Sequence, residues 1–162
     1  MRQRAQKPKR VMVWAGVGYN LKTPLVFISE GTKINQVVYR NLLRHEVRAW
    51  MKEKALDFTF QQDGAPAHTA NETQAWCERN FSDFIRKEHW PPSSPDLTPL
   101  DYSIWGILQQ KVCAQPHKDI GSLMESLQTA WDALDQEVIN KAIEQLPERL
   151  KACVEAKGGH FE

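Results

Sequence analysis

The first two apolar runs of the chain predict a β-hairpin. Residues 11–17 are apolar throughout and lead into Gly, Tyr and Asn at positions 18–20, the pattern of a buried strand that ends in a turn. A second apolar run covers residues 24–29 and is closed by a Glu-Gly pair. Two short strands joined by a turn favour antiparallel pairing.

Residues 34–54 predict a long helix. Apolar residues recur there at roughly helical spacing and no proline interrupts the pattern. Thr32 or Asn35 is suited to cap the first turn. A third strand is expected at residues 58–62, with two phenylalanines on one face. A hairpin, a helix and a further strand in this order are typical of an α/β fold.

The middle of the chain predicts two helices separated by a proline-rich loop. Thr69 and Glu72 have the spacing of a capping box at the start of the first helix. Residues 83–87 are suited to a short edge strand, and residues 90–99 contain four prolines. The second helix is expected over residues 99–112.

The last third of the chain predicts three helices. Apolar residues recur at helical spacing over residues 120–134 and 136–145, and Pro147 opens a final helix that a Gly-Gly pair ends. No internal repeat or linker divides the chain. We therefore expect a basic N-terminal arm of residues 1–10 and a single α/β domain of residues 11–162, in which helices flank a mixed sheet.

The composition favours a folded protein rather than a disordered or membrane-spanning one. With 162 residues, of which 41% are hydrophobic and 25% charged, the chain is long enough to bury a core. No apolar run approaches the ~20 residues that cross a bilayer, and the first residues lack the pattern of a secretory signal. We expect a soluble intracellular protein without membrane association.

The first ten residues are strongly basic. Five of the 21 lysines and arginines lie there with no acidic residue among them, although the formal net charge of the chain is only +1. They are Arg2, Arg4, Lys7, Lys9 and Arg10. Such an arm is suited to contact a nucleic-acid backbone or to direct nuclear import. A solvated, frayed terminus is the alternative, and the sequence leaves both open.

The cysteines and histidines do not predict a zinc site. Cys77, Cys113 and Cys153 lie far apart, no CxxC pair occurs, and the five histidines lack the spacing of zinc ligands. Reduced thiols are expected.

Asp63 is the first candidate for chemistry. It follows the predicted strand at residues 58–62 and precedes a Gly-Ala-Pro turn, and the carboxyl ends of strands in α/β sheets are where catalytic groups collect. The alternative is that an aspartate before glycine only shapes a turn. Gln62 and His68 flank Asp63 closely enough to orient its carboxylate or to touch a substrate, although a turn or packing role is open for both.

Asp101 is the second candidate. Thr98 and Asp101 have the spacing of a helix cap, so that the carboxylate would bond the first turn and favour the helix dipole. Against this, Asp101 shares a helix face with apolar residues, which places its carboxylate at the border of the core. Asp96, between Pro95 and Leu97, is interpreted as a residue that shapes the loop rather than as a ligand.

Two motifs of the chain together resemble those of the mariner family of transposases. They are Gln-Gln-Asp-Gly-Ala-Pro-Ala-His-Thr-Ala at residues 61–70 and Trp-Pro-Pro-Ser-Ser-Pro-Asp-Leu-Thr-Pro-Leu-Asp-Tyr at residues 90–102. The resemblance covers nearly the whole chain and implies a ribonuclease-H-like fold. It maps the second and third catalytic aspartates of the family onto Asp63 and Asp101, which 37 residues separate.

The resemblance also implies a mechanism and partners. Cut-and-paste transposases hydrolyse DNA strands at transposon ends and join the freed 3′ ends to target DNA in the nucleus. A two-metal site of Mg²⁺ or Mn²⁺, with the ions about 3.5–4 Å apart, activates the attacking group and stabilises the leaving oxygen. Carboxylates are the ligands that these ions prefer. A homodimer, or association with a full-length transposase, is implied as well.

One element of such a site is not found in the sequence. The family pattern places a first catalytic aspartate on a strand before the hairpin, whereas only ten basic and polar residues precede the hairpin in this chain. We therefore expect the sheet to lack its first strand, to have an unpaired edge and to be marginally stable. We also expect the chain as written to be unable to cut DNA alone.

Three hypotheses remain open from the sequence. The chain is a catalytic-domain piece from a truncated element or an incomplete gene model, a non-catalytic module that binds nucleic acid or a transposase, or a relic without a role. Salt-dependent DNA binding without cleavage would favour the second hypothesis.

Overall fold

A computed structural model describes residues 10–54 and 56–161. The predicted hairpin is confirmed, and it is built in two steps. β1 (Met12–Trp14) pairs antiparallel with β4 (Val26–Ile28), and β2 (Val17–Gly18) pairs with β3 (Leu21–Lys22) at the tip. Between the two ladders, Gly16 and Thr23 bond each other: Gly16 N–H donates to Thr23 Oγ1 at 2.8 Å, and Thr23 N–H donates to Gly16 O at 2.9 Å.

The predicted long helix is confirmed as three consecutive segments. They are α1 (Gln36–Leu42), a π-helical segment (Leu43–Arg48) and α2 (Ala49–Glu53). Of the two predicted caps, Asn35 serves: its side-chain oxygen accepts from the N–H groups of Val37 and Val38, which satisfies donors that a helix start leaves unpaired.

The third strand and the edge strand pair with each other. β5 (Thr59–Phe60) and β6 (Asp83–Phe84) run parallel, and they are connected through α3 (Pro66–Thr69) and α4 (Asn71–Asn80). The predicted capping box is wrong. Thr69 is the last residue of α3, and its hydroxyl donates back to the carbonyls of Ala65 and Pro66 instead of accepting from α4.

The remaining helices follow the sequence pattern. After short 3-10 turns at Lys87–His89 and Pro95–Leu97, a π-helical segment (Leu100–Ile104) continues into α5 (Trp105–Val112). The C-terminal helices are α6 (Ile120–Asp132), α7 (Gln136–Glu144) and α8 (Leu146–Glu155). The Gly-Gly pair ends the last helix as predicted, because Gly158 takes a positive φ of 78° and its N–H donates to the Cys153 carbonyl.

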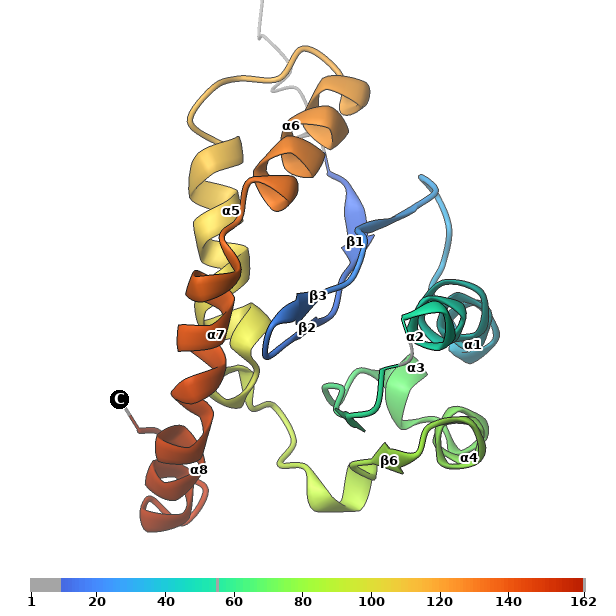
Figure 1. Cartoon of the computed structure of the whole chain (residues 1–162), viewed down its shortest axis with the longest axis vertical. Coiled ribbons are helices and arrows are strands. Elements are labelled where there is room, and N and C mark those ends of the chain that lie inside the picture. Colours follow the sequence, from blue (N-terminus) through green and yellow to red (C-terminus); the bar gives the residue numbers. More distant parts are fainter. Residues whose placement is uncertain (1–9, 55, 162) are drawn as a thin grey trace, which may run out of the picture.

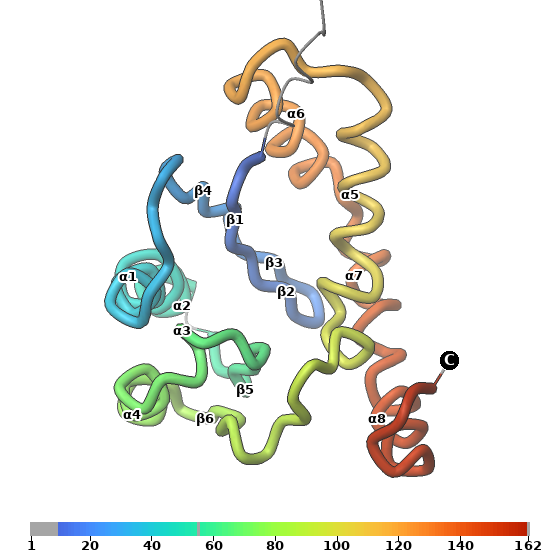
Figure 2. Tube along the Cα trace, turned by 180° about the vertical axis from the view of Figure 1, so that it is seen from behind, coloured from blue at the N-terminus to red at the C-terminus, as the bar shows by residue number. Residues whose placement is uncertain are grey.

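Among the described residues, the six strands form three separate two-stranded sheets. β1 is paired only with β4, and β5 only with β6, within this part of the chain. Both pairs therefore have a strand edge that no described strand covers. The hairpin lies between two helical groups, with α5 to α8 on one side and α1 to α4 on the other (Figures 1 and 2).

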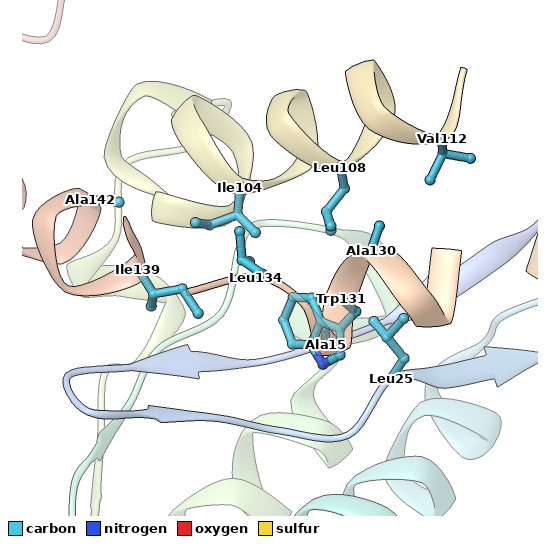
Figure 3. Packing of buried hydrophobic residues seen from close by; sticks show 10 residues of the cluster. All are labelled: Ala15, Leu25, Ile104, Leu108, Val112, Ala130, Trp131, Leu134, Ile139 and Ala142. Atoms are coloured by element: carbon cyan, nitrogen blue, oxygen red, sulfur yellow. The ribbon is translucent and has the colours of Figure 1, made fainter. Parts of the chain in front are cut away.

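The first of two hydrophobic cores joins the hairpin to the C-terminal helices (Figure 3). Its buried members are Ala15, Leu25, Ile104, Leu108, Val112, Ala130, Trp131, Leu134, Ile139 and Ala142. Lys22 adds a polar link, because its ammonium group donates to the carbonyls of Trp131 and Leu134 at the C-terminal end of α6. A positive charge at this end of a helix also interacts favourably with the helix dipole.

The second core lies on the other side of the hairpin. Its buried members come from α1 to α4 and from the β5 region: Tyr39, Leu43, Val47, Met51, Phe60, Ala67, Trp76, Cys77 and Phe81. Trp14 of β1 packs against this core, whereas its neighbour Ala15 belongs to the first. The hairpin is therefore shared by both cores, because successive residues of an extended chain point to opposite sides.

Candidate active site

Asp63 lies just past the end of β5, at the turn that leads into α3. Its Oδ1 accepts a hydrogen bond from the N–H of Ala65 at 3.0 Å, and Pro66 then opens the helix with a φ angle that suits its first turn. About half of the Asp63 side chain is exposed. The turn therefore fixes the carboxylate while leaving it accessible to solvent.

His68 holds the same carboxylate oxygen. Nδ1 of His68 lies 2.6 Å from Oδ1 of Asp63, and the imidazole is mostly buried. The hydrogen bond from His68, supported by the one from Ala65, lowers the pKa of Asp63 below its ordinary value. The structure thus favours the ionised form of Asp63 and places His68 as a residue that orients it.

Asp101 lies in the first turn of the π-helical segment. Of the two interpretations of Asp101, the helix cap is not found, because this segment begins without a side-chain cap and the buried Thr98 hydroxyl has no partner among the described residues. The carboxylate of Asp101 is therefore not used by the helix start. Partial burial raises its pKa, and the negative charge of Asp63 raises it further.

The loop before Asp101 is fixed by a residue far along the chain. Arg149 of α8 donates to the backbone carbonyl of Asp96 at 3.2 Å, and its guanidinium lies 3.9 Å from the centre of the Tyr102 ring. Tyr102 in turn donates its hydroxyl to the carbonyl of Ala142. Asp96 thus fixes the loop through its backbone carbonyl, which accepts from Arg149, in agreement with the interpretation that it shapes the loop.

The two carboxylates suit a divalent cation. They lie close enough for the charge of one to raise the pKa of the other, and a cation between them would relieve that repulsion. Both are oxygen donors with an accessible face, as Mg²⁺ and Mn²⁺ require. Within residues 10–54 and 56–161, no group of three or more acidic, histidine or cysteine side chains is placed to hold a metal.

The opposite pKa shifts predict opposite effects of removing each charge. In a chelator near neutral pH, Asp101→Asn is expected to raise the midpoint of thermal unfolding, because ionised Asp101 is disfavoured in the fold. Asp63→Asn is expected to lower it, because the folded state stabilises ionised Asp63. Thermal unfolding followed by circular dichroism measures both.

The sign of the pH dependence is the check on this prediction. The folded pKa of Asp101 lies above the unfolded one, so the gain from Asp101→Asn is present near neutral pH and fades as pH falls through the raised pKa. The folded pKa of Asp63 lies below the unfolded one, so the loss from Asp63→Asn fades only at a more acid pH. Shifts of equal sign would contradict the described electrostatics.

The predicted nucleic-acid contacts are only partly covered. Arg10 is exposed at the start of the described chain, whereas Arg2, Arg4, Lys7 and Lys9 lie outside the described residues.

None of the helices in the described part is long and apolar enough to cross a bilayer. All three cysteines are free thiols, and burial raises the pKa of Cys77 to about 12.

Sequence reasoning missed two residues that support the site. Tyr39 of α1 stacks on His68 with 4.0 Å between ring centres, and burial raises the pKa of its hydroxyl strongly. Arg149 fixes the loop before Asp101. Tyr39 follows two valines and reads as an ordinary core position, and Arg149 lies 53 positions from its partner, so no local pattern pointed to either.

The fold is that of the ribonuclease-H-like DDE class. The structure matches the crystal structure of the catalytic domain of the Mos1 mariner transposase, with a TM-score of 0.76 and 26% identity, over 96% of this chain and 78% of that one. It also matches the mariner Mos1 paired end complex with Mg, with a TM-score of 0.81 and 25% identity, over 99% of this chain and 49% of that one.

The homologues of this chain are Tc1/mariner transposases. The Tcb1 transposase of Caenorhabditis briggsae is 30% identical over 149 residues, which make up 91% of this chain and 52% of that protein. The Mos1 transposase of Drosophila mauritiana is 30% identical over 105 residues, or 64% of this chain and 29% of that protein. No family model matches. The resemblance to mariner transposases is thus confirmed, and the chain spans about half the length of the Tc1-type relatives.

Proposed function

We propose that this chain supplies part of the catalytic region of a cut-and-paste DNA transposase, and that Asp63 and Asp101 are metal ligands in it. The observation that carries the proposal is the approach of these two carboxylates. They are 37 residues apart in sequence and belong to segments on different hydrophobic cores, yet their charges interact. The match to a mariner catalytic domain supports the interpretation of these two carboxylates as catalytic metal ligands.

The proposed cofactor is Mg²⁺ or Mn²⁺. A bound ion of this kind polarises a DNA phosphate and lowers the pKa of an attacking water or hydroxyl. The residues of this chain would position the two carboxylates that hold the ion. His68 and the Ala65 N–H hold Asp63 ionised and oriented, and the loop that Arg149 fixes delivers Asp101. Support for the metal comes from the Mos1 structures that contain Mg.

We further propose that a protein of these 162 residues binds metal but does not cleave DNA by itself. A two-metal phosphoryl-transfer site needs more oxygen ligands than two carboxylates provide. No third acidic side chain joins Asp63 and Asp101 among the described residues. Mn²⁺-dependent nicking of plasmid DNA that disappears in Asp63→Asn would contradict this part of the proposal.

The proposed partner is DNA, bound at transposon ends and at a target, in the nucleus. Support comes from Mos1, whose structures include paired-end and strand-transfer complexes. A dimer on paired ends, or association with a full-length transposase, belongs to the same proposal. The basic arm favours a second candidate, DNA binding without catalysis. Replacing its five basic residues with glutamine would then flatten the salt dependence of DNA affinity.

The experiment that tests the metal site is a Mn²⁺ titration followed by electron paramagnetic resonance, together with thermal unfolding in MgCl₂. We expect the wild-type chain to bind Mn²⁺ and to unfold at a higher temperature in MgCl₂, because a ligand that binds only the folded state stabilises it. Asp63→Asn and Asp101→Asn are each expected to weaken Mn²⁺ binding by about tenfold or more.

Asp132→Asn is the matched control, because it removes an exposed carboxylate on α6. It is expected to leave Mn²⁺ binding unchanged. Binding that is equal in all four proteins would mean that the metal binds elsewhere, and the proposed function would lose its central support.

A further inference from the structure

A continuous set of contacts connects a buried tyrosine on α1 with the carboxylate of Asp63. Tyr39 is 2% exposed, and its hydroxyl donates to Oε1 of Gln62 at 2.7 Å. Nε2 of Gln62 donates to the backbone carbonyl of His68 at 3.2 Å. His68 then contacts Asp63 through its ring. Three polar contacts thus lead from the second core to the proposed metal ligand.

Tyr39 and Gln62 restrain His68 in two different ways. The Tyr39 ring lies against the imidazole, with 4.0 Å between centres and 31° between planes, and this stacking limits rotation of the imidazole. The Gln62 amide holds the main chain of His68, where Gln74 also donates to the same carbonyl at 2.9 Å. With ring and main chain both held, Nδ1 of His68 is directed at Asp63.

The hydrogen bonds to Asp63 all fall on one oxygen. Within the described residues, Nδ1 of His68 and the N–H of Ala65 both bond Oδ1. Oδ2 is thereby left as the oxygen for a metal ion, with the carboxylate plane already set. The arrangement matches the way in which outer partners orient a metal ligand and fix the tautomer of a histidine.

We propose that Tyr39 and Gln62 are positioning residues for the metal ligand Asp63, and that they act through His68. The inference rests on the proposed function of Asp63. It assigns the Nδ1–H tautomer to His68 and makes the Tyr39 hydroxyl part of the site, although it touches neither metal nor substrate. A tyrosine that only filled the core would need a hydrogen-bond partner as well, so the test must separate the two roles.

The variants are Tyr39→Phe and Gln62→Met, with Tyr19→Phe as the matched control. Tyr39→Phe keeps the stacked ring and removes only the hydroxyl. Gln62→Met keeps the length of the side chain and removes both amide contacts. The Tyr19 hydroxyl bonds exposed Glu144 near the hairpin tip, so its removal deletes the same group at a distant place.

Two readouts are made on the full 162-residue chain. Nitrogen NMR of histidine in a chelator reports which ring nitrogen of His68 carries the proton, and the Mn²⁺ titration reports the affinity of the site. We expect a single Nδ1–H tautomer in wild type and Tyr19→Phe, and a mixture in Gln62→Met. Mn²⁺ affinity is expected to fall about tenfold in Gln62→Met and by a smaller factor in Tyr39→Phe.

The outcomes distinguish this inference from the proposed function. If Asp63→Asn binds Mn²⁺ as wild type does, the proposed function fails. If Asp63→Asn loses Mn²⁺ while Tyr39→Phe and Gln62→Met keep both wild-type affinity and a single tautomer, the positioning role is wrong. Should Gln62→Met not fold, Tyr39→Phe decides, because it leaves the buried ring in place.

Discussion

Replacing Trp131 with alanine is expected to lower the free energy of unfolding by about 3–5 kcal/mol. The indole is 1% exposed at the centre of the first core, and its N–H donates to the Thr23 carbonyl at 2.9 Å. Truncation removes apolar burial, leaves a cavity and strips a buried carbonyl of its donor. The hairpin would then lose its main attachment to the C-terminal helices.

Urea unfolding followed by circular dichroism measures this loss, and two further variants make the result interpretable. Trp131→Phe keeps an aromatic ring but not the N–H donor, and it is expected to cost about 1–3 kcal/mol. Val154→Ala, at a position 77% exposed, is expected to change little. Equal losses in Trp131→Ala and Val154→Ala would mean that the first core does not depend on Trp131.

Leu43→Ala is expected to lower the free energy of unfolding by about 2–5 kcal/mol. Leu43 is fully buried in the second core, on the π-helical segment between α1 and α2. It belongs to one buried cluster with Tyr39 and Val47. The cavity would therefore open in the core that contains Tyr39, whose ring lies against His68. The same substitution at Leu150, which is 38% exposed, is the matched control and is expected to change stability by less than about 0.5 kcal/mol.

Amide hydrogen exchange gives Leu43→Ala a second, local readout. Protection is expected to fall most in α1, α2 and α4, which enclose Leu43, and less in α5 and α6, which surround the first core. Uniform loss of protection over both groups of helices would contradict the description of two separate cores.

The order of elements was predictable because each has a local pattern. The hairpin followed from two apolar runs around a turn, and the break at Gly16 and Thr23 adds only detail. The end of α8 followed from a Gly-Gly pair, since glycine accepts the positive φ that a helix end requires. Asn35 was foreseen as one of two possible caps.

The caps expected at Thr69 and Thr98 fail for different reasons. Pro66 opens α3 early enough that Thr69 is already helical, so it cannot stand outside α4 as a cap. Thr98 does stand just before the helix, because its backbone is extended and its carbonyl accepts from the N–H groups of Asp101 and Tyr102. Only its hydroxyl is not used, since that group has no partner among the described residues. The spacing of a cap therefore predicts where a threonine stands better than it predicts the hydrogen bond of its side chain.

The candidate site shows a similar division. Asp63 and Asp101 were predictable as candidates from their motifs, but the approach of one to the other depends on tertiary packing. The contacts of Tyr39 with Gln62 and of Arg149 with Asp96 join positions 23 and 53 residues apart. Gln62 and His68 were candidates because they are close to Asp63 in sequence, but a local pattern contains no information at such separations, so Tyr39 and Arg149 were found only in the structure.

The division into two hydrophobic cores means that the distance between the two aspartates depends on how one core sits against the other. Asp63 follows Phe60 of the second core, whereas Asp101 precedes Ile104 of the first. A rotation of one core against the other would therefore change the distance between the two proposed metal ligands. A cation present at a hundred times its Kd would oppose such a rotation by about 2.7 kcal/mol, because it would bind only when both carboxylates are within reach.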